Sequence, residues 1–538
     1  MKIRSLFPLF LSLVVLVHIC SYFWADTNRV FAEGLSGDTL MSSYYYQIFA
    51  NSYESGFPVH KLEAFDHPSP HNIQNQFPST FDAQLLSPIM ALASWPSNWA
   101  YIHVFILCLC WVSWIFFGWS LGCRGWLLAA LGVQGLLFRP MWTQFLLGRY
   151  NLVFSPVLLL SMAFLLSSQR KNIQGGENPR FIRFISYLLF VPVSLWGFLL
   201  YPPFALMLVP FGVYIVVCST RINKNSHWRI AAIICIVITL IFPFVQSILS
   251  SQSSNIGQCD TSLCPVPATV LTWNRIQPIG QDISLPNLSV ARENWWLIGV
   301  SLLFIRSWRH LFILLFPIGF IVFAMGPCPD IPIGKSHIES IWDTFPFLHC
   351  TITYVHDLSR LGMVGLLLIP FCFILCTKRN LITTFLFILI TSHLLWRSQF
   401  EIGDSPYWWN TNGKNSIISH VEEYQPSVIV ELPFDQSQQF VSAIHYPNIA
   451  RINPWTLNAK PPLNDESLHF IFEVGYERSI KSTPTKEGFI GLGLNYIYFD
   501  KQRCRTSKAC RDVPEKYMNP ILGKPLVLDD GSFVWSIQ

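Results

Sequence analysis

The first feature that could carry chemistry is an acidic residue shortly after an apolar run. Asp38, in SGDTLMSSYYYQ (36–47), follows the apolar residues 5–25 and opens an amphipathic helical pattern. Asp is a favoured helix N-cap, and a carboxylate near a membrane surface can also act as a general base. Met41, Tyr45 and Ile48 share one helical face, which favours a helix lying in the membrane interface. Tyr45 can also stack on a sugar.

A second polar group follows in EAFDHPSPHN (63–72). Asp66, His67 and His71 could supply another acid, two metal ligands or contacts to an acceptor. Pro68 and Pro70 preclude a regular helix that would align the two histidines. The pattern therefore favours a solvated turn. No resident cofactor or metal is expected, and a divalent cation remains an open alternative.

Arginines close to the ends of apolar runs form a third group, Arg139, Arg149 and Arg360. Arginine binds phosphate with two parallel hydrogen bonds, but an arginine at a span end can also simply reach the lipid headgroups. His356 and Asp357 precede Arg360, which favours a functional role for Arg360. For Arg139 and Arg149 the residues themselves favour the headgroup contact over a functional role.

Composition predicts what must position these residues. The chain has 538 residues, of which 51% are hydrophobic and only 12% charged, and the charges are sparse up to about residue 400 and denser afterwards. Soluble domains carry about a quarter charged residues. We therefore predict a mainly α fold, a polytopic bundle of about eleven transmembrane helices with a C-terminal extracytoplasmic α/β domain. The net charge of +5 lies mostly in short loops, which argues against nucleic-acid binding.

The predicted domain division is 1–400, a membrane domain whose first outer loop is 26–98, and 401–538, the polar tail. The first run, 5–25, is expected to be an uncleaved span, because no small-x-small cleavage site follows it. Some of the other runs are short for a full crossing, which indicates tilted or broken helices. The further candidate spans are 99–121, 126–138, 153–168, 184–200, 204–218, 230–249, 295–305, 311–325, 361–376 and 381–396.

Basic clusters and cysteines give two indications of topology. If every run crosses, all the clusters share one side, which is the cytoplasm by the positive-inside rule; they are Arg124, Arg170–Lys171, Arg221 with Lys224, Arg306 with Arg309, and Lys378–Arg379. Three cysteine pairs then fall in outer segments: Cys259 with Cys264, Cys328 with Cys350, and Cys504 with Cys510. Disulfides are favoured there over zinc, because CDTSLC and CRTSKAC have loop-closing spacings and lack nearby histidine ligands.

The tail has the pattern of a separate α/β module. Residues 427–433 and 495–500 are predicted strands, 436–446 and 464–480 predicted helices, and 524–537 a predicted hairpin that turns at Asp-Asp-Gly.

The arrangement resembles the GT-C type of integral membrane glycosyltransferases, and more closely a group of large bacterial membrane proteins placed near that superfamily. At 148–151 the chain reads Gly-Arg-Tyr-Asn, where those proteins often carry a histidine before an asparagine. The similar stretches are GDTLMSSYYYQIF (37–49), FDHPSP (65–70), NWAYIHVF (98–105), GRYNLVFSPVLLL (148–160), SRLGMVGLLLI (359–369), VIVELPFD (428–435), IHYPNIARINPW (444–455) and LGKPLVLDDGSFVW (522–535).

The resemblance implies transfer of a sugar from a polyprenyl-phosphate donor to a glycan, lipid or protein acceptor. The reaction would occur on the outer face of a bacterial cytoplasmic membrane. Asp38 would be the base, with Asp66 as the next candidate. Arg360, Arg149, His67 and Tyr45 would bind substrate.

A lipid or sugar-lipid transporter, or a membrane protein without catalysis, is the rival hypothesis. Transporters often show internal repeats and ionisable residues in mid-membrane. Here the predicted spans hold almost none, and the polar residues gather in the outer loops. This distribution favours a site at the membrane surface.

The cysteine assignment is testable without knowing the function. Mass spectrometry of the unreduced protein should find the Cys259–Cys264, Cys328–Cys350 and Cys504–Cys510 pairs linked, because all three lie in segments assigned to an oxidising side. Free thiols at these positions would contradict the assignment and weaken the topology with it.

Overall fold

In the computed structural model, the described residues are 6–200, 292–324, 332–337 and 359–537. Within these ranges there are gaps at 26–28, 32–36, 56–60, 63–70, 73–80, 147, 149–152, 154–155, 170–179, 306–307, 334–335, 378–380, 404–407, 411–415, 436–441, 445, 447–448, 453–464 and 505–507. The described chain is mainly helical, with a small sheet in its C-terminal part. It forms two compact units, Met1–Asp26 with His103–Tyr407, and Thr27–Ile102 with Trp408–Gln538.

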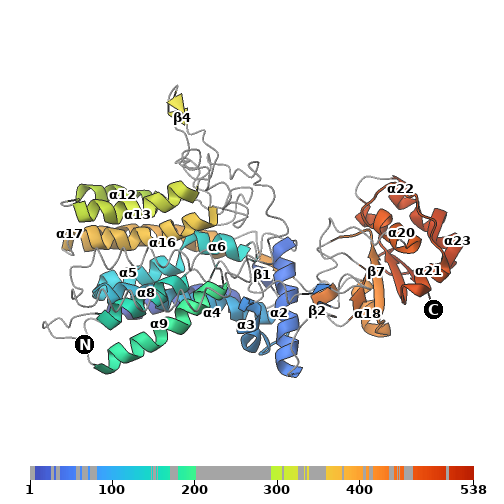
Figure 1. Ribbon diagram of the computed structural model, residues 1–538, viewed down its shortest axis with the longest axis horizontal. Coiled ribbons are helices and arrows are strands. Elements are labelled where there is room, and N and C mark those ends of the chain that lie inside the picture. Colours follow the sequence, from blue (N-terminus) through green and yellow to red (C-terminus); the bar gives the residue numbers. More distant parts are fainter. Residues whose placement is uncertain are drawn as a thin grey trace. The chain divides into compact units, whose positions relative to one another are not determined.

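The first unit is built from apolar helices, and each predicted span on described residues corresponds to a helix (Figure 1). By length and composition, α1 and α4 are the described helices able to cross a membrane. The number of about eleven spans therefore stays a prediction, and the runs 204–218 and 230–249 lie outside the described residues. The helices are α1 (Phe7–Trp24), α4 (Ser97–Ser120), α5 (Gly125–Leu136), α6 (Arg139–Leu146), α8 (Pro156–Gln169), α9 (Arg180–Leu200), α12 (Arg292–Leu303), α13 (Trp308–Ala324), α16 (Ser359–Cys376) and α17 (Leu381–Gly403).

Helix α5 lies at the centre of this unit, where it packs against α1 and α17. Its residues from Leu127 to Leu136 are all buried. The glycine at 132 leaves room for side chains of α4, because a Cβ there would meet Trp111 and Ile115 at about 3 Å. The helix stops at Leu136, and Trp142 of α6 donates its indole N–H to the Leu136 carbonyl at 2.9 Å. A backbone acceptor freed at the helix end is thus satisfied inside the protein.

Side-chain hydrogen bonds join several helices of the first unit. Gln134 of α5 donates to Thr391 of α17 at 2.9 Å, and Trp111 of α4 donates to Ser12 of α1 at 3.2 Å. The hydroxyls of Ser161 in α8 and Ser194 in α9 lie 2.7 Å apart. Such polar pairs between apolar helices are typical of helix packing in membranes. The unit also contains the short strand pair β4 (Pro332–Ile333) and β5 (Ser336–His337).

The second unit combines two segments that lie far apart in the sequence. Strand β1 (Arg29–Phe31), which follows α1, pairs antiparallel with β6 (Trp408–Asn410), which follows α17. The first segment continues through α2 (Gly37–Ser55), a strand pair β2 (Lys61–Leu62) and β3 (His71–Asn72), and α3 (Phe81–Met90). Helix α2 packs on α3, and Gln47 of α2 accepts a hydrogen bond from Asn98 at 3.0 Å.

The tail contains a five-stranded sheet in the order β10-β11-β9-β7-β8. Strands β8, β7 and β9 run parallel, and β11 and β10 continue the sheet antiparallel. The structure confirms the predicted strands and hairpin, whereas β8 and α18 were not predicted. The strands are β7 (Val428–Leu432), β8 (Ala450–Arg451), β9 (Tyr496–Phe499), β10 (Leu526–Val527) and β11 (Phe533–Ser536); the helical elements are α18 (Ser416–Tyr424), α20 (Glu466–Gly475), α21 (Lys486–Gly491), η6 (Lys501–Arg503), α22 (Lys508–Arg511), η7 (Pro514–Met518) and α23 (Asn519–Leu522).

The two faces of this sheet differ. Val428, Val430 and Leu432 point to the larger apolar cluster, which includes residues of α20 and α21. Ile429 points to the opposite face, where α18 contributes to a smaller cluster. Because side chains alternate along a strand, Glu431 lies on the α18 face. A charged residue is therefore placed inside a buried sheet face.

Close packing at one glycine of the tail gives a stability prediction. A Cβ on Gly475, at the end of α20, would overlap the ring of Phe434. We expect Gly475→Ala to lower the free energy of unfolding by about 1–3 kcal/mol, as overpacking of a core does. Gly491→Ala in α21 is the matched control, because a Cβ there meets nothing within 4 Å. Thermal unfolding of the purified chain checks this, and equal melting temperatures for the two variants would contradict it.

Candidate functional site

The structure places Asp38 in the first turn of α2, which begins at Gly37. The predicted N-cap role is therefore corrected, since the helix starts one residue before Asp38. An acid in the first turn still interacts favourably with the helix dipole. The general-base role is not tested by the structure and stays a prediction.

Helix α2 presents its tyrosines differently from the predicted stripe. Tyr44 and Tyr46 are buried, and Tyr45 between them is half-buried. The ring of Tyr46 lies 5.5 Å from that of Trp99, at the start of α4. The best-packed face of α2 is thus not the one that carries Tyr45, so the proposed contact of Tyr45 with sugar remains untested.

Of the other predicted catalytic and substrate-binding residues, the structure describes Arg360 alone. Arg360 is the second residue of α16. Asp66, His67 and Arg149 lie outside the described residues, as do Cys259, Cys264, Cys328 and Cys350.

The predicted Cys504–Cys510 disulfide is present, with Cα atoms 5.8 Å apart. Both cysteines are buried in the larger apolar cluster of the tail. The bridge immediately follows Arg503 and joins the end of η6 to α22. The bridge therefore fixes the backbone on the C-terminal side of Arg503.

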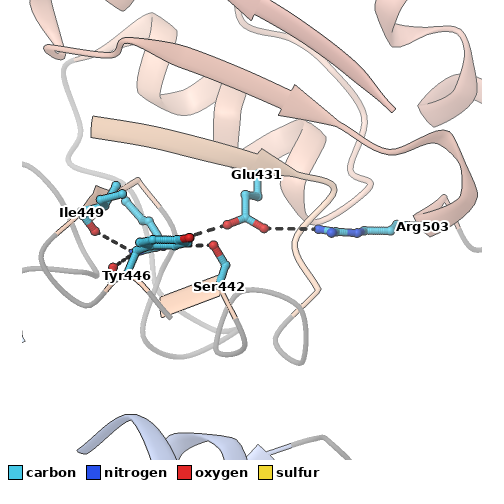
Figure 2. A network of polar contacts seen from close by, with 6 residues as sticks. Glu431, Ser442, Tyr446, Ile449 and Arg503 are labelled. Atoms are coloured by element: carbon cyan, nitrogen blue, oxygen red, sulfur yellow. Dashed lines mark hydrogen bonds and ion pairs between the residues drawn. The ribbon is translucent and has the colours of Figure 1, made fainter. Parts of the chain in front are cut away.

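A buried network of charges lies at the carboxyl ends of the parallel strands (Figure 2). Its centre is Glu431 on β7, whose side chain is fully buried. One carboxylate oxygen lies 3.6 Å from Nε of Arg451, and the other lies 3.7 Å from Nη1 of Arg503. Both distances exceed that of an ordinary N–H···O hydrogen bond. Within the described chain neither oxygen accepts a hydrogen bond.

Arg451 lies on β8 and is also fully buried. Its guanidinium donates to the carbonyls of Ile449 at 2.7 Å and Tyr446 at 3.2 Å, and to the Ser442 hydroxyl at 3.0 Å. Burial lowers the pKa of Arg451, and the charge of Glu431 opposes that change. Arg451 therefore ties the connection between β7 and β8 to the centre of the sheet.

Arg503 lies on the other side of Glu431, just beyond β9. Its Nε is 3.2 Å from Oδ2 of Asp500. The other oxygen of Asp500, Oδ1, accepts a hydrogen bond from the backbone N–H of Gln502 at 2.8 Å. The Arg503 side chain is 8% exposed and that of Asp500 is 22% exposed. Asp500, Arg503, Glu431 and Arg451 thus form a chain of alternating charge that starts at the surface and ends in the interior. We call it the charge chain.

Neutral polar groups support the charge chain on the α18 face. Tyr498 faces Glu431 across the register of β9 and β7. Burial and the nearby Glu431 charge raise the pKa of Tyr498, while burial lowers that of His420. Both groups are therefore neutral near pH 7, and one hydrogen bond of 2.8 Å joins the Tyr498 hydroxyl to Nδ1 of His420 in α18.

The sequence interpretation did not single out Glu431, Arg451 or Arg503. A glutamate inside the apolar run VIVELP was the available signal, since a buried carboxylate needs a cationic partner. The run did not reveal which cation pairs with it, because both arginines are distant in sequence. No protein-family model matches this chain, and no curated protein shows significant similarity to it. Among the described residues, no group of three His, Cys, Asp or Glu side chains could hold a metal ion.

The buried network predicts a strong effect of removing its central charge. Glu431→Gln leaves two buried guanidiniums without their carboxylate, and breaking a buried pair in this way costs about 3–5 kcal/mol of unfolding free energy. Urea unfolding followed by tryptophan fluorescence would measure it.

Glu515→Gln is the control for that experiment, because Glu515 pairs with Lys501 at 2.7 Å on the surface. Exposed pairs are worth less than about 1 kcal/mol. If both variants lose equally little stability, the charge chain does not hold the tail together.

Proposed function

We propose that this protein is a membrane glycosyltransferase that moves a sugar from a polyprenyl-phosphate donor to an envelope acceptor. The reaction occurs on the outer face of a bacterial cytoplasmic membrane. The proposal rests on the sequence resemblance together with the way the described helices and the first outer loop are arranged.

Exposed apolar stripes on the helical unit support a membrane location. Leu381, Phe385 and Leu389 of α17 are exposed and recur every four residues. Phe181, Phe184 and Leu188 of α9 follow the same helical spacing, as do exposed residues of α1. Helices of water-soluble proteins direct such stripes inward, because apolar side chains exposed to water cost free energy. Contact of the same side chains with lipid tails carries no such cost. These helices suit a bilayer, and the polytopic arrangement is part of the proposal.

One observation carries the proposal furthest, the pairing of β1 with β6. These strands follow α1 and α17 directly, so both helices end where the second unit begins. If α1 and α17 cross the bilayer, their C-terminal ends lie on the same side. The first loop, with Asp38, and the tail would then share one aqueous face. Such a unit at the membrane surface is what a lipid-linked donor requires.

Asp38 would act as the base in a single displacement. Its carboxylate would take the proton from the acceptor hydroxyl while that oxygen attacks the anomeric carbon. The bond between the anomeric carbon and the phosphate oxygen breaks, and polyprenyl phosphate leaves with the electron pair. Arg360 would bind the phosphate, and Tyr45, His67 and Arg149 would contact the sugars. Asp66 and a divalent cation remain alternatives for activation.

Asp38→Asn tests the proposal. The substitution keeps the side-chain size but removes the proton acceptor, so transfer should fall by roughly 10²–10⁴-fold. Thermal stability should change by less than about 1 kcal/mol, the usual size of a charge effect in a first helical turn. The assay follows radiolabelled sugar from native lipid extracts into cell-envelope acceptors.

Asp465→Asn is the matched control, because Asp465 caps α20 in the tail and asparagine caps nearly as well. It should leave transfer unchanged. Undiminished transfer in Asp38→Asn would remove Asp38 from the mechanism.

A further inference from the structure

The topology of the tail sheet points to a position where a ligand can bind. The chain leaves β7 and returns on one side as β8, then crosses to the other side of β7 as β9. The strand order therefore reverses at β7, and all three strands are parallel. In open α/β sheets, ligands bind outside the carboxyl ends of the strands at such a switch point.

Polar side chains gather at this switch point. Asp435 follows the end of β7, and Asp500 follows the end of β9 directly. The guanidinium of Arg503 lies between the two strand ends, 3.2 Å from Asp500 and 3.7 Å from Glu431. Asp500 and Arg503 are the partly exposed members of the charge chain, so a ligand can reach them from solvent.

The charge chain retains unused hydrogen-bonding capacity. Nε and Nη1 of Arg503 are buried and donate no hydrogen bond within the described chain, and both oxygens of Glu431 accept none. Unmet polar groups of this kind are rare in protein interiors. These atoms are buried, so a ligand reaches the charge chain at its partly exposed members, Asp500 and Arg503.

The chemistry of this edge favours sugar hydroxyls over phosphate. A hydroxyl both donates and accepts hydrogen bonds, which matches a guanidinium flanked by carboxylates. Lys501, the nearest other cation in sequence, already pairs with Glu515 at 2.7 Å. In the charge chain, the carboxylates of Asp500 and Glu431 balance the guanidiniums of Arg503 and Arg451. No net positive charge is left there to attract a phosphate.

We infer that the carboxyl edge between β7 and β9 is a saccharide-binding subsite, with Arg503 and Asp500 as its contact residues. Glu431 and Arg451 position Arg503 from behind. The inference rests on the proposed function in that it assigns this subsite to the saccharide part of a substrate. Binding is measured without transfer, so the two proposals can fail separately.

The test measures binding to the full-length protein in lipid nanodiscs, because glucoside and maltoside detergents would compete for a saccharide subsite. The probes are the methyl glycosides of glucose, galactose, mannose and N-acetylglucosamine, with inorganic phosphate as the rival. Saturation-transfer NMR should detect at least one glycoside. Arg503→Lys should weaken its binding about tenfold or more, because lysine cannot reproduce the planar fork of arginine.

Two further variants make the result decisive. Arg511→Lys, at an exposed position on α22, should bind as the parent does. Asp500→Asn keeps an oxygen acceptor for Gln502 but removes the charge, and it should also weaken glycoside binding. It replaces Arg503→Lys as the test if that variant is unstable. The inference is overturned if no glycoside binds, or if phosphate alone binds. It is also overturned if Arg503→Lys and Asp500→Asn both bind the glycoside as tightly as the parent protein does.

Discussion

Four side chains of alternating charge, Asp500, Arg503, Glu431 and Arg451, hold together the carboxyl ends of three parallel strands. Taking such charges out of water is expensive, and each is tolerated only because its neighbour carries the opposite sign. The β7–β8 connection depends on Arg451, the placement of η6 depends on Asp500, and both depend on Glu431. The tail therefore has a polar centre on one face of its sheet and an apolar core on the other.

This division of labour explains which parts of the tail could be predicted. Strand β7 follows from the run of β-branched residues around Glu431, because periodicity is a local property. The partners of Glu431 do not follow, because Arg451 and Arg503 reach it only after the chain has folded across the sheet. The sequence pattern likewise does not predict the two-residue strand β8, because this strand forms only by pairing with β7. The Cys504–Cys510 pair was predictable because its two cysteines are close in sequence.

In the helical unit, the apolar runs predicted where helices occur. They did not predict how deeply each helix is buried or where it ends. Helix α5 has 12 residues, whereas a span needs about 20, and it is buried from Leu127 to Leu136. At its C-terminal end, the Leu136 carbonyl accepts a hydrogen bond from the indole of Trp142. Hydrophobic periodicity does not predict such a contact. With Asp38 as cap the helix would begin at Thr39, and it begins two residues earlier, at Gly37. Boundaries of helices shift by that much for small energetic reasons.

The pairing of β1 with β6 has a consequence during synthesis of the chain. Val30 pairs with Trp409, about 380 residues later in the chain. At roughly 5–20 residues per second of synthesis, β1 waits about 20–75 s before its partner exists. Throughout that interval the segment carrying α2 presents an open strand edge, which other chains can pair with. A nascent chain that stops before β6 lacks the partner strand of β1, so this edge stays open.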